Sequence, residues 1–166
     1  LVNYGYIEKH QGKKSYIKKK PETQELTTVS SYTEEILRKG MIPSRKLIFK
    51  EIRICTESEQ ELLNLDKATP VFYMERIIYA NNTPLCYTTT TLPYTIFRDI
   101  EFYDFENNSL YDTIENKFNI PIDSSNLKLK AVPANTTISN YLNIEKNTPL
   151  LFSSAVTYGR VNNCVI

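Results

Sequence analysis

The sequence predicts a mixed α/β domain in which short helices alternate with strands. From residue 26 onward, helix caps and helically spaced apolar residues alternate with segments rich in β-branched and aromatic residues. The length of 166 residues favours one globular domain, long enough to bury roughly two thirds of the surface of its unfolded chain. The helix caps, the apolar spacing and the strand-like segments together predict the order of the elements.

The N-terminal segment predicts a small hairpin followed by a linker. Residues 6–17 run extended on both sides of a turn at residues 11–13. Two short strands are not stable alone, so this hairpin is expected to belong to a larger unit. Residues 18–23 are typical of a linker, because Pro21 disfavours helix at Lys20.

The next expected elements are a helix over residues 32–39 and a strand over residues 44–55. Ser31 and Glu34 have the spacing of a capping box, in which each side chain accepts the backbone N–H of the other residue. Gly40 follows as the residue that most often ends a helix, because glycine adopts a left-handed backbone at little cost.

A second helix and a β-hairpin are expected in the middle of the chain. Ser58 with Glu61 predicts the helix cap. The leucines of this helix are Leu62, Leu63 and Leu65. Residues 71–79 and 85–92 have strand composition and flank the turn residues Asn81-Asn82, which predicts a hairpin.

The last third of the chain predicts two more helices and two more strands. Ser109 with Asp112 is expected to cap a third helix. Its core-facing residues recur at a spacing of four, at Leu110, Ile114 and Phe118. A strand over 125–132, a helix over 136–142 and a strand over 150–158 complete the order.

An internal repeat joins the two halves of the chain. Residues 63–72 resemble residues 142–151, and the same shift places Tyr79 on Tyr158. Each copy consists of a helix, a Pro-containing turn and the start of a hairpin. Moving the first copy's second strand, 85–92, forward by this shift predicts a further strand from residue 164.

The formal net charge of +1 is the sum of two differently charged parts. Residues 1–20 contain six lysines and one glutamate, which leaves about +5, so residues 21–166 carry about −4. A basic segment of this kind favours contact with phosphates, although a lysine run can also be a solvated linker.

Several kinds of site are disfavoured. Cys55, Cys86 and Cys164 lack CxxC spacing and stand among apolar residues, which predicts reduced core cysteines and a cytoplasmic location. His10 is the single histidine, so no zinc centre is expected, and we expect no other metal or cofactor.

No apolar run approaches the roughly 18 residues of a membrane helix, and no signal-peptide pattern is present.

Three stretches of the chain resemble a known family. They are residues 5–17, residues 26–44, and residues 75–84 continued by 92–93 and 109–111. Together they resemble GntR-type bacterial transcription regulators of the HutC subfamily. The first stretch is similar to the wing of the winged-helix DNA-binding domain, and the other two are similar to the effector-binding UTRA domain.

The resemblance implies both an architecture and a function. The implied fold is α/β (α+β), with a mostly antiparallel sheet flanked by short helices, similar to chorismate lyase and usually dimeric. Residues 1–20 would be the wing and linker, with Lys13 and Lys14 on the DNA backbone, and residues 21–166 the effector domain. The implied protein is a ligand-responsive DNA-binding regulator, expected to be a repressor.

The resemblance also implies an effector site. The expected residues are Tyr32, Thr33, Arg76, Thr88, Ser109 and Tyr111. Backbone N–H groups at a helix start suit an anion, because they are unpaired and carry partial positive charge. Each assignment has a structural alternative: Ser31 can simply cap its helix, Tyr111 can be a core residue, and Arg76 can pair with a carboxylate.

Two departures from the family pattern weaken the expectation of a phosphosugar. A second strand arginine is replaced by Ile78, and Thr88 stands at the position of a strand glutamate. Losing such hydrogen-bonding groups typically costs about 1 to 3 kcal/mol each. The effector is therefore expected to be a phosphosugar or another, less charged small metabolite.

Two other function classes were weighed. An enzyme is suggested only by analogy with the chorismate lyase fold, and the sequence contains no nucleophile with a base, so we predict that the chain is not an enzyme. A domain that has lost ligand sensing and serves only dimerisation is the alternative to a ligand-responsive regulator.

Overall fold

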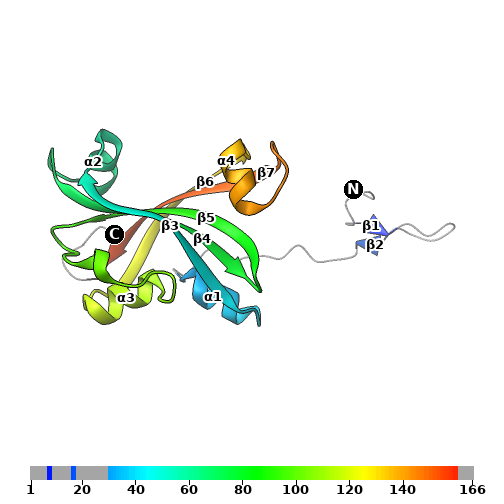
Figure 1. Cartoon of the computed structure of the whole chain (residues 1–166), viewed down its shortest axis with the longest axis horizontal. Helices are drawn as coiled ribbons and strands as arrows, with labels where there is room; N and C mark the ends of the chain where they lie inside the picture. Colours follow the sequence, from blue (N-terminus) through cyan, green and yellow to red (C-terminus); the bar gives the residue numbers. More distant parts are fainter. Residues whose placement is uncertain (1–6, 9–15, 18–29, 161–166) are drawn as a thin grey trace.

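The computed structural model describes residues 7–8, 16–17 and 30–160 (Figure 1). In chain order the elements are β1 (Ile7–Glu8), β2 (Tyr16–Ile17), α1 (Tyr32–Arg38), β3 (Pro43–Ile54), α2 (Glu57–Leu63), β4 (Pro70–Ala80), β5 (Thr83–Pro93), the 3₁₀ helix η1 (Ile100–Phe102), α3 (Leu110–Lys117), β6 (Ile122–Pro133), α4 (Thr136–Leu142) and β7 (Pro149–Gly159). The expected alternation of short helices and strands is confirmed.

All the strand pairs of the described residues are antiparallel. β4 lies between β3 and β5 in a three-stranded sheet, while β6 pairs with β7. The predicted N-terminal hairpin is present as β1 paired with β2. Lys13, Lys14 and the strand expected from residue 164 lie outside the described residues. The predicted fold class, a mostly antiparallel sheet with short helices, is confirmed.

The turn between β4 and β5 follows from its two asparagines. Asn81 and Asn82 have φ angles of 49° and 63°. A two-residue turn with positive φ at both positions matches the twist of the flanking strands, and asparagine tolerates that backbone better than most residues. The predicted hairpin is therefore confirmed at its predicted turn.

Two helix caps agree with prediction and one is corrected. The Ser31–Glu34 capping box opens α1, and the Ser109 hydroxyl accepts the N–H of Asp112 at the start of α3. For α2, Ser58 with Glu61 is wrong as the cap, because Thr56 and Glu59 form the box two residues earlier. The helix also ends at Leu63, so Leu65 lies beyond it.

A contact from outside the helix accounts for this earlier cap. Both Thr56 and Ser58 precede a glutamate by three residues, so the local pattern fits either of them. Arg53, near the end of β3, donates from both terminal nitrogens to the Glu59 carboxylate over 2.7 Å. This bidentate pair fixes Glu59 beside the Thr56 N–H and selects the earlier cap.

The predicted repeat is confirmed and covers two whole strand-helix-strand units. Residues 43–80 form β3, α2 and β4, and residues 122–159 form β6, α4 and β7, with every boundary shifted equally. Asn64 and Asn143 end the two helices in the left-handed conformation, with φ of 50° and 53°. In Figure 1, α2 and α4 lie on one side of the strands, at the top of the view, and α1 and α3 lie on the opposite side, at the bottom.

The main core lies where β4 and β5 pack against α3 and the preceding loops. Its buried residues are Phe72, Met74, Leu92, Phe97, Ile100, Phe105, Ile114 and Ile120. Ile114 is fully buried, and Leu110 and Phe118 pack against the same cluster, which confirms the predicted apolar face of α3. Burial of this face anchors α3 against the three-stranded sheet.

The β6–β7 pair exposes apolar side chains that a core would normally cover. The large apolar residues exposed on it are Leu127, Leu129, Leu151 and Phe152, which we call the β6–β7 apolar set. Leu151 is 72% exposed. The β6–β7 register places Leu127, Leu129 and Leu151 on one face of the pair and Phe152, opposite Lys130, on the other. Exposed apolar residues gathered on one face are typical of an interaction surface.

Two of the predicted reduced cysteines are in the described residues. Cys55 is buried, Cys86 is half-buried, and neither forms a disulfide; Cys164 lies outside this range. Within residues 30–160, no helix is long and apolar enough to cross a membrane.

Candidate functional site

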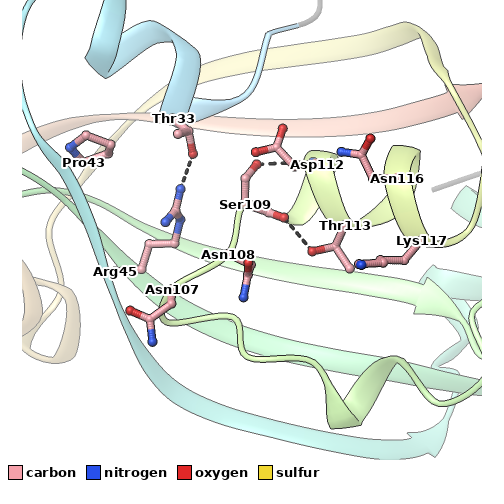
Figure 2. A pocket seen from close by; sticks show the side chains of 10 residues that line it. All are labelled: Thr33, Pro43, Arg45, Asn107, Asn108, Ser109, Asp112, Thr113, Asn116 and Lys117. Atoms are coloured by element: carbon pink, nitrogen blue, oxygen red, sulfur yellow. Dashed lines mark hydrogen bonds between the residues drawn. The ribbon is translucent and has the colours of Figure 1, made fainter.

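An open pocket of about 500 Å³ lies between the start of α1 and the start of α3 (Figure 2). Its lining residues are Thr33, Pro43, Arg45, Asn107, Asn108, Ser109, Asp112, Thr113, Asn116 and Lys117. They come from three segments: the first turn of α1, the start of β3, and α3 with the loop before it. Two of the predicted site residues, Thr33 and Ser109, are therefore brought together.

Arg45 extends from β3 across the opening between α1 and α3. Its guanidinium Nη2 donates a hydrogen bond to the hydroxyl of Thr33. Partial burial lowers the pKa of Arg45 below its ordinary value, and the nearby Asp112 carboxylate acts in the opposite direction. The guanidinium stays charged at neutral pH, so this side of the pocket is cationic.

Ser109 sets the geometry of the opposite side. It is buried, and its hydroxyl accepts the N–H of Asp112 over 3.4 Å as the N-cap of α3. Its carbonyl accepts the hydroxyl of Thr113 over 2.8 Å. The cap uses the hydroxyl as an acceptor, and a serine O–H can also donate one hydrogen bond. Ser109 therefore caps α3 as predicted, and its hydroxyl can still donate one hydrogen bond.

Arg76 lies on β4 and is not among the residues that line the pocket. Its residue surface is only 5% exposed, and Nε and Nη1 have no hydrogen-bond partner among the described residues. The guanidinium carbon lies 5.7 Å from the centre of the Phe105 ring. Burial and, after it, the charge of Arg45 lower the pKa of Arg76 to about 10. The structural alternative for Arg76, a carboxylate partner, is not found among these residues.

The other three predicted site residues lie outside the pocket lining. The Tyr32 hydroxyl interacts with Cys86 and Ser153, and burial raises its pKa to about 12. The Tyr111 hydroxyl is 3.3 Å from the hydroxyl of Thr157 on β7. The Thr88 hydroxyl donates to the carbonyl of Arg76 over 3.4 Å, directly across the β4–β5 ladder.

Sequence reasoning missed Arg45, which with Lys117 is one of the two basic residues in the pocket lining. In the β3–β4 ladder, Arg45 lies opposite Ile78, the position where a second arginine was expected and not found. A basic residue on the neighbouring strand was visible in the sequence, but the strand register that brings it to this place was not. Asp112 was seen only as a helix-cap residue, although it lines the same pocket.

With this geometry in place, comparison with known proteins decides the family. Residues 38–165 match the UTRA domain. The chain belongs to the UTRA domain family. The predicted family and its implied UTRA fold are therefore confirmed.

Relatives of this UTRA domain are regulators. The HTH-type transcriptional repressor NagR of Bacillus subtilis is 28% identical over 158 residues, which cover 95% of this chain and 65% of NagR. The effector domain of PhnF from Mycobacterium smegmatis has a similar fold, with a TM-score of 0.76, 21% identity, and coverage of 82% of this chain and 83% of that chain.

A third comparison links the fold to the GntR family by sequence as well as structure. A GntR-family transcriptional regulator from Enterococcus faecalis is 29% identical with a TM-score of 0.64, and the match covers 74% of this chain and 86% of that one. These relatives are named as regulators rather than enzymes, in agreement with the predicted non-enzymatic role. The chain spans just under two thirds of the length of NagR.

Proposed function

We propose that this UTRA domain is the effector-sensing part of a transcription repressor. The observation that carries the proposal is the match to the family over residues 38–165, together with 28% identity to a protein named as a transcriptional repressor. The polar pocket between α1 and α3 supplies a place for a small metabolite. Effector binding there would shift the protein between DNA-binding and DNA-releasing arrangements, which requires different affinities for the two states.

The predicted site residues take unequal parts in this proposal. Thr33 and Ser109 line the pocket and would contact the effector. Arg76, outside the lining, would contribute positive charge from β4, while Thr88 donates to the backbone carbonyl of Arg76. The remaining two predicted residues, Tyr32 and Tyr111, would close the pocket toward β7, because their hydroxyls interact with Ser153 and Thr157. The effector would be a phosphosugar or another, less charged small metabolite.

DNA contact would come from the N-terminal part of the protein. We assign residues 1–20 to the wing and linker of a winged-helix domain and residues 21–166 to the effector domain. Lys13 and Lys14 would contact phosphates, which position a protein on DNA without reading its sequence. Such a regulator acts on operator DNA in the cytoplasm.

The β6–β7 apolar set suits a second copy of this chain. Leu127, Leu129 and Leu151 lie on one face of this strand pair and form a surface that water contacts unfavourably. A homodimer would cover this surface and couple two effector pockets to two DNA half-sites.

Gel-shift measurements on the full-length protein test the regulatory proposal. We expect binding to its own promoter region that weakens steeply with salt, and release of the DNA when a phosphosugar or related metabolite is added. The matched control is Lys13→Gln with Lys14→Gln, which should weaken DNA binding without changing the response to the effector. Absence of any promoter shift at low salt would rule out the regulator.

Thermal-shift screening of the chain separates a sensing domain from a dimerisation domain. A stabilising metabolite is expected for a sensor, because a ligand that binds only the folded state raises the unfolding temperature. No response across phosphosugars, amino acids and lipids, combined with a stable dimer in light scattering, would favour the dimerisation-only function instead.

A further inference from the structure

We infer that a row of contacting side chains across the three-stranded sheet holds the second repeat unit at a fixed orientation to the first. The row crosses the face of β3, β4 and β5 that lies opposite the main core, from α2 of the first unit to α4 of the second. In order, its members are Glu59, Arg53, Tyr73, Glu75, Tyr87 and Tyr141, which we call the outer-face network. None of them lines the effector pocket, so the network does not depend on the proposed sensing function.

The strand register places four members of the network on one face of the sheet. Side chains alternate between the two faces of a strand, so Tyr73 and Glu75 on β4 lie on the face opposite the main core. Through the ladders that β4 forms with β3 and β5, Arg53 and Tyr87 lie on that same face. Figure 1 shows α2 and α4 on one side of the strands, and each of these helices supplies one end of the network.

Arg53 joins two members of the network because its guanidinium makes contacts through different parts. Its two terminal nitrogens donate to the Glu59 carboxylate over 2.7 Å. Its guanidinium carbon lies 4.6 Å from the centre of the Tyr73 ring. The donors of a guanidinium lie in its plane while its face packs on aromatic rings, so the two contacts do not compete.

Glu75 joins the next two members by accepting a hydrogen bond from each. The Tyr73 hydroxyl donates to its Oε1 over 2.8 Å, and the Tyr87 hydroxyl also donates to this carboxylate. Burial, and then the bond to Glu75, raise the pKa of Tyr73 to about 12 and that of Tyr87 above its ordinary value. Both hydroxyls therefore keep their protons at neutral pH, and one carboxylate has enough lone pairs to accept both.

The last contact of the network crosses to the second repeat unit. The ring of Tyr87 stacks on that of Tyr141, with centres 5.4 Å apart and planes inclined by 23°. Contacts between the second unit and the three-stranded sheet are concentrated between α4 and β5, the elements that carry these two tyrosines. The network ends at this junction and would set the orientation of the β6–β7 apolar set relative to the sheet.

A connected network and a separate pair of stacked rings respond differently to substitution. Hydrogen bonds in one network strengthen each other, and residues that share partners are coupled in their effects on stability. Loosening any member of the outer-face network should therefore be felt in α4, β6 and β7. A separate pair of rings would respond only to changes in Tyr87 or Tyr141 that disturb their stacking.

Hydrogen exchange of the chain, measured by mass spectrometry at one fixed protein concentration, tests the network. Tyr87→Phe removes the hydroxyl that bonds to Glu75 but keeps the ring that stacks on Tyr141. We expect exchange in α4, β6 and β7 to become about fivefold faster, the factor that corresponds to one lost hydrogen bond. Exchange in α3 should stay unchanged.

The matched control is Tyr79→Phe, which removes the same group from another half-buried tyrosine of the sheet. The Tyr79 hydroxyl forms no hydrogen bond among the residues that the structure describes. This variant should leave exchange in α4, β6 and β7 unchanged. An increase equal to that of Tyr87→Phe would show that the bond to Glu75 is not the cause.

A variant at the far end of the network, Arg53→Met, gives a second test. It removes the contacts with Glu59 and Tyr73 and should also speed exchange in α4, β6 and β7. Circular dichroism checks its folding, and Tyr87→Phe decides alone if Arg53→Met does not fold.

The double variant of Arg53→Met and Tyr87→Phe separates one network from two independent contacts. In one network the second substitution adds little in α4, β6 and β7, whereas independent contacts give rate factors that multiply. Multiplied factors in the double variant would overturn the network, and so would faster exchange in Tyr87→Phe that is confined to β4 and β5.

Discussion

At the scale of single residues, the Arg53–Glu59 pair joins a strand to a helix cap. Glu59 accepts from both terminal nitrogens of Arg53 and from the hydroxyl of Thr91, each over 2.7 Å. It also accepts the backbone N–H of Thr56. These bonds, Arg53 first, lower the pKa of Glu59 from its ordinary value of 4.5 to about 2. The carboxylate therefore links β3, α2 and β5 only while it is ionised.

This pKa predicts a specific loss of stability in acid. Because the pKa is lower in the folded state, the ionised carboxylate stabilises the protein above about pH 4.5, and this contribution is lost as the pH falls toward 2. Glu59→Gln should therefore lower the free energy of unfolding by about 1–3 kcal/mol at pH 7. The difference between the variant and the wild type should vanish near pH 2.

Urea denaturation of both proteins at several pH values measures this difference. Glu57→Gln is the control, because Glu57 lies on the same helix and is exposed. A difference between the wild type and Glu59→Gln that stays constant from pH 7 to pH 2 would contradict an ionic role for Glu59.

At the scale of elements, the two repeat units share a backbone device at the end of each helix. Asn64 in the first unit and Asn143 in the second are exposed and left-handed, and each is followed by a turn and a proline that begins a strand. Placing a residue other than glycine or asparagine in the left-handed conformation lowers stability by about 1–2 kcal/mol. The repeat therefore preserves a backbone conformation rather than a set of buried contacts.

Matched substitutions in the two units test this equivalence. Asn64→Ala and Asn143→Ala should each lower the free energy of unfolding by about 1 kcal/mol, because alanine tolerates positive φ poorly. Asn64→Gly and Asn143→Gly should be neutral or slightly stabilising. Chemical denaturation gives the four values, and a large cost for the glycine variants would show that the asparagine side chains matter instead.

A stacked pair of tyrosines connects the second repeat unit to the three-stranded sheet of β3, β4 and β5. Tyr141 on α4 lies over Tyr87 on β5, with ring centres 5.4 Å apart and planes inclined by 23°. We expect Tyr141→Ala to lower the free energy of unfolding by about 1–3 kcal/mol, because it removes both the stacking and the buried area. Tyr141→Phe keeps the ring and should cost far less. Similar losses in the two variants, measured by urea unfolding, would assign the effect to the hydroxyl.

At the scale of the whole molecule, the strands differ in how strongly pairing and burial protect them against local opening. β4 is paired on both sides, and Val71, Phe72 and Met74 on it are fully buried. The β6–β7 pair instead presents its exposed apolar set. Strands with full pairing and burial open only with the global unfolding of a protein, whereas exposed pairs open locally.

Hydrogen exchange measured by mass spectrometry tests this difference. We expect the slowest exchange in β4 and faster exchange in β6 and β7 at low protein concentration. If a second copy covers the β6–β7 apolar set, protection of these two strands should rise with protein concentration while that of β4 stays constant. Protection of β6 and β7 that equals that of β4 at every concentration would contradict the exposed surface.

The sequence by itself determined the order of the helices and strands, two of the three predicted caps, the Asn81-Asn82 turn and the repeat. These features depend on residues at most a few positions apart, or on direct likeness between two segments. The family could also be recognised, because its motifs are contiguous. Thr33 and Ser109, which the resemblance implied, both line the pocket, since each belongs to a helix start.

Only the tertiary structure decided which residues complete the pocket and which cap opens α2. Arg45 lies opposite Ile78 through a strand register, and Glu59 is selected by Arg53 rather than by its own helix. The lack of a hydrogen-bond partner for Nε and Nη1 of Arg76 among the described residues is likewise a property of packing. Register and burial depend on contacts between distant segments, so local sequence patterns leave several arrangements open and the folded core selects one of them.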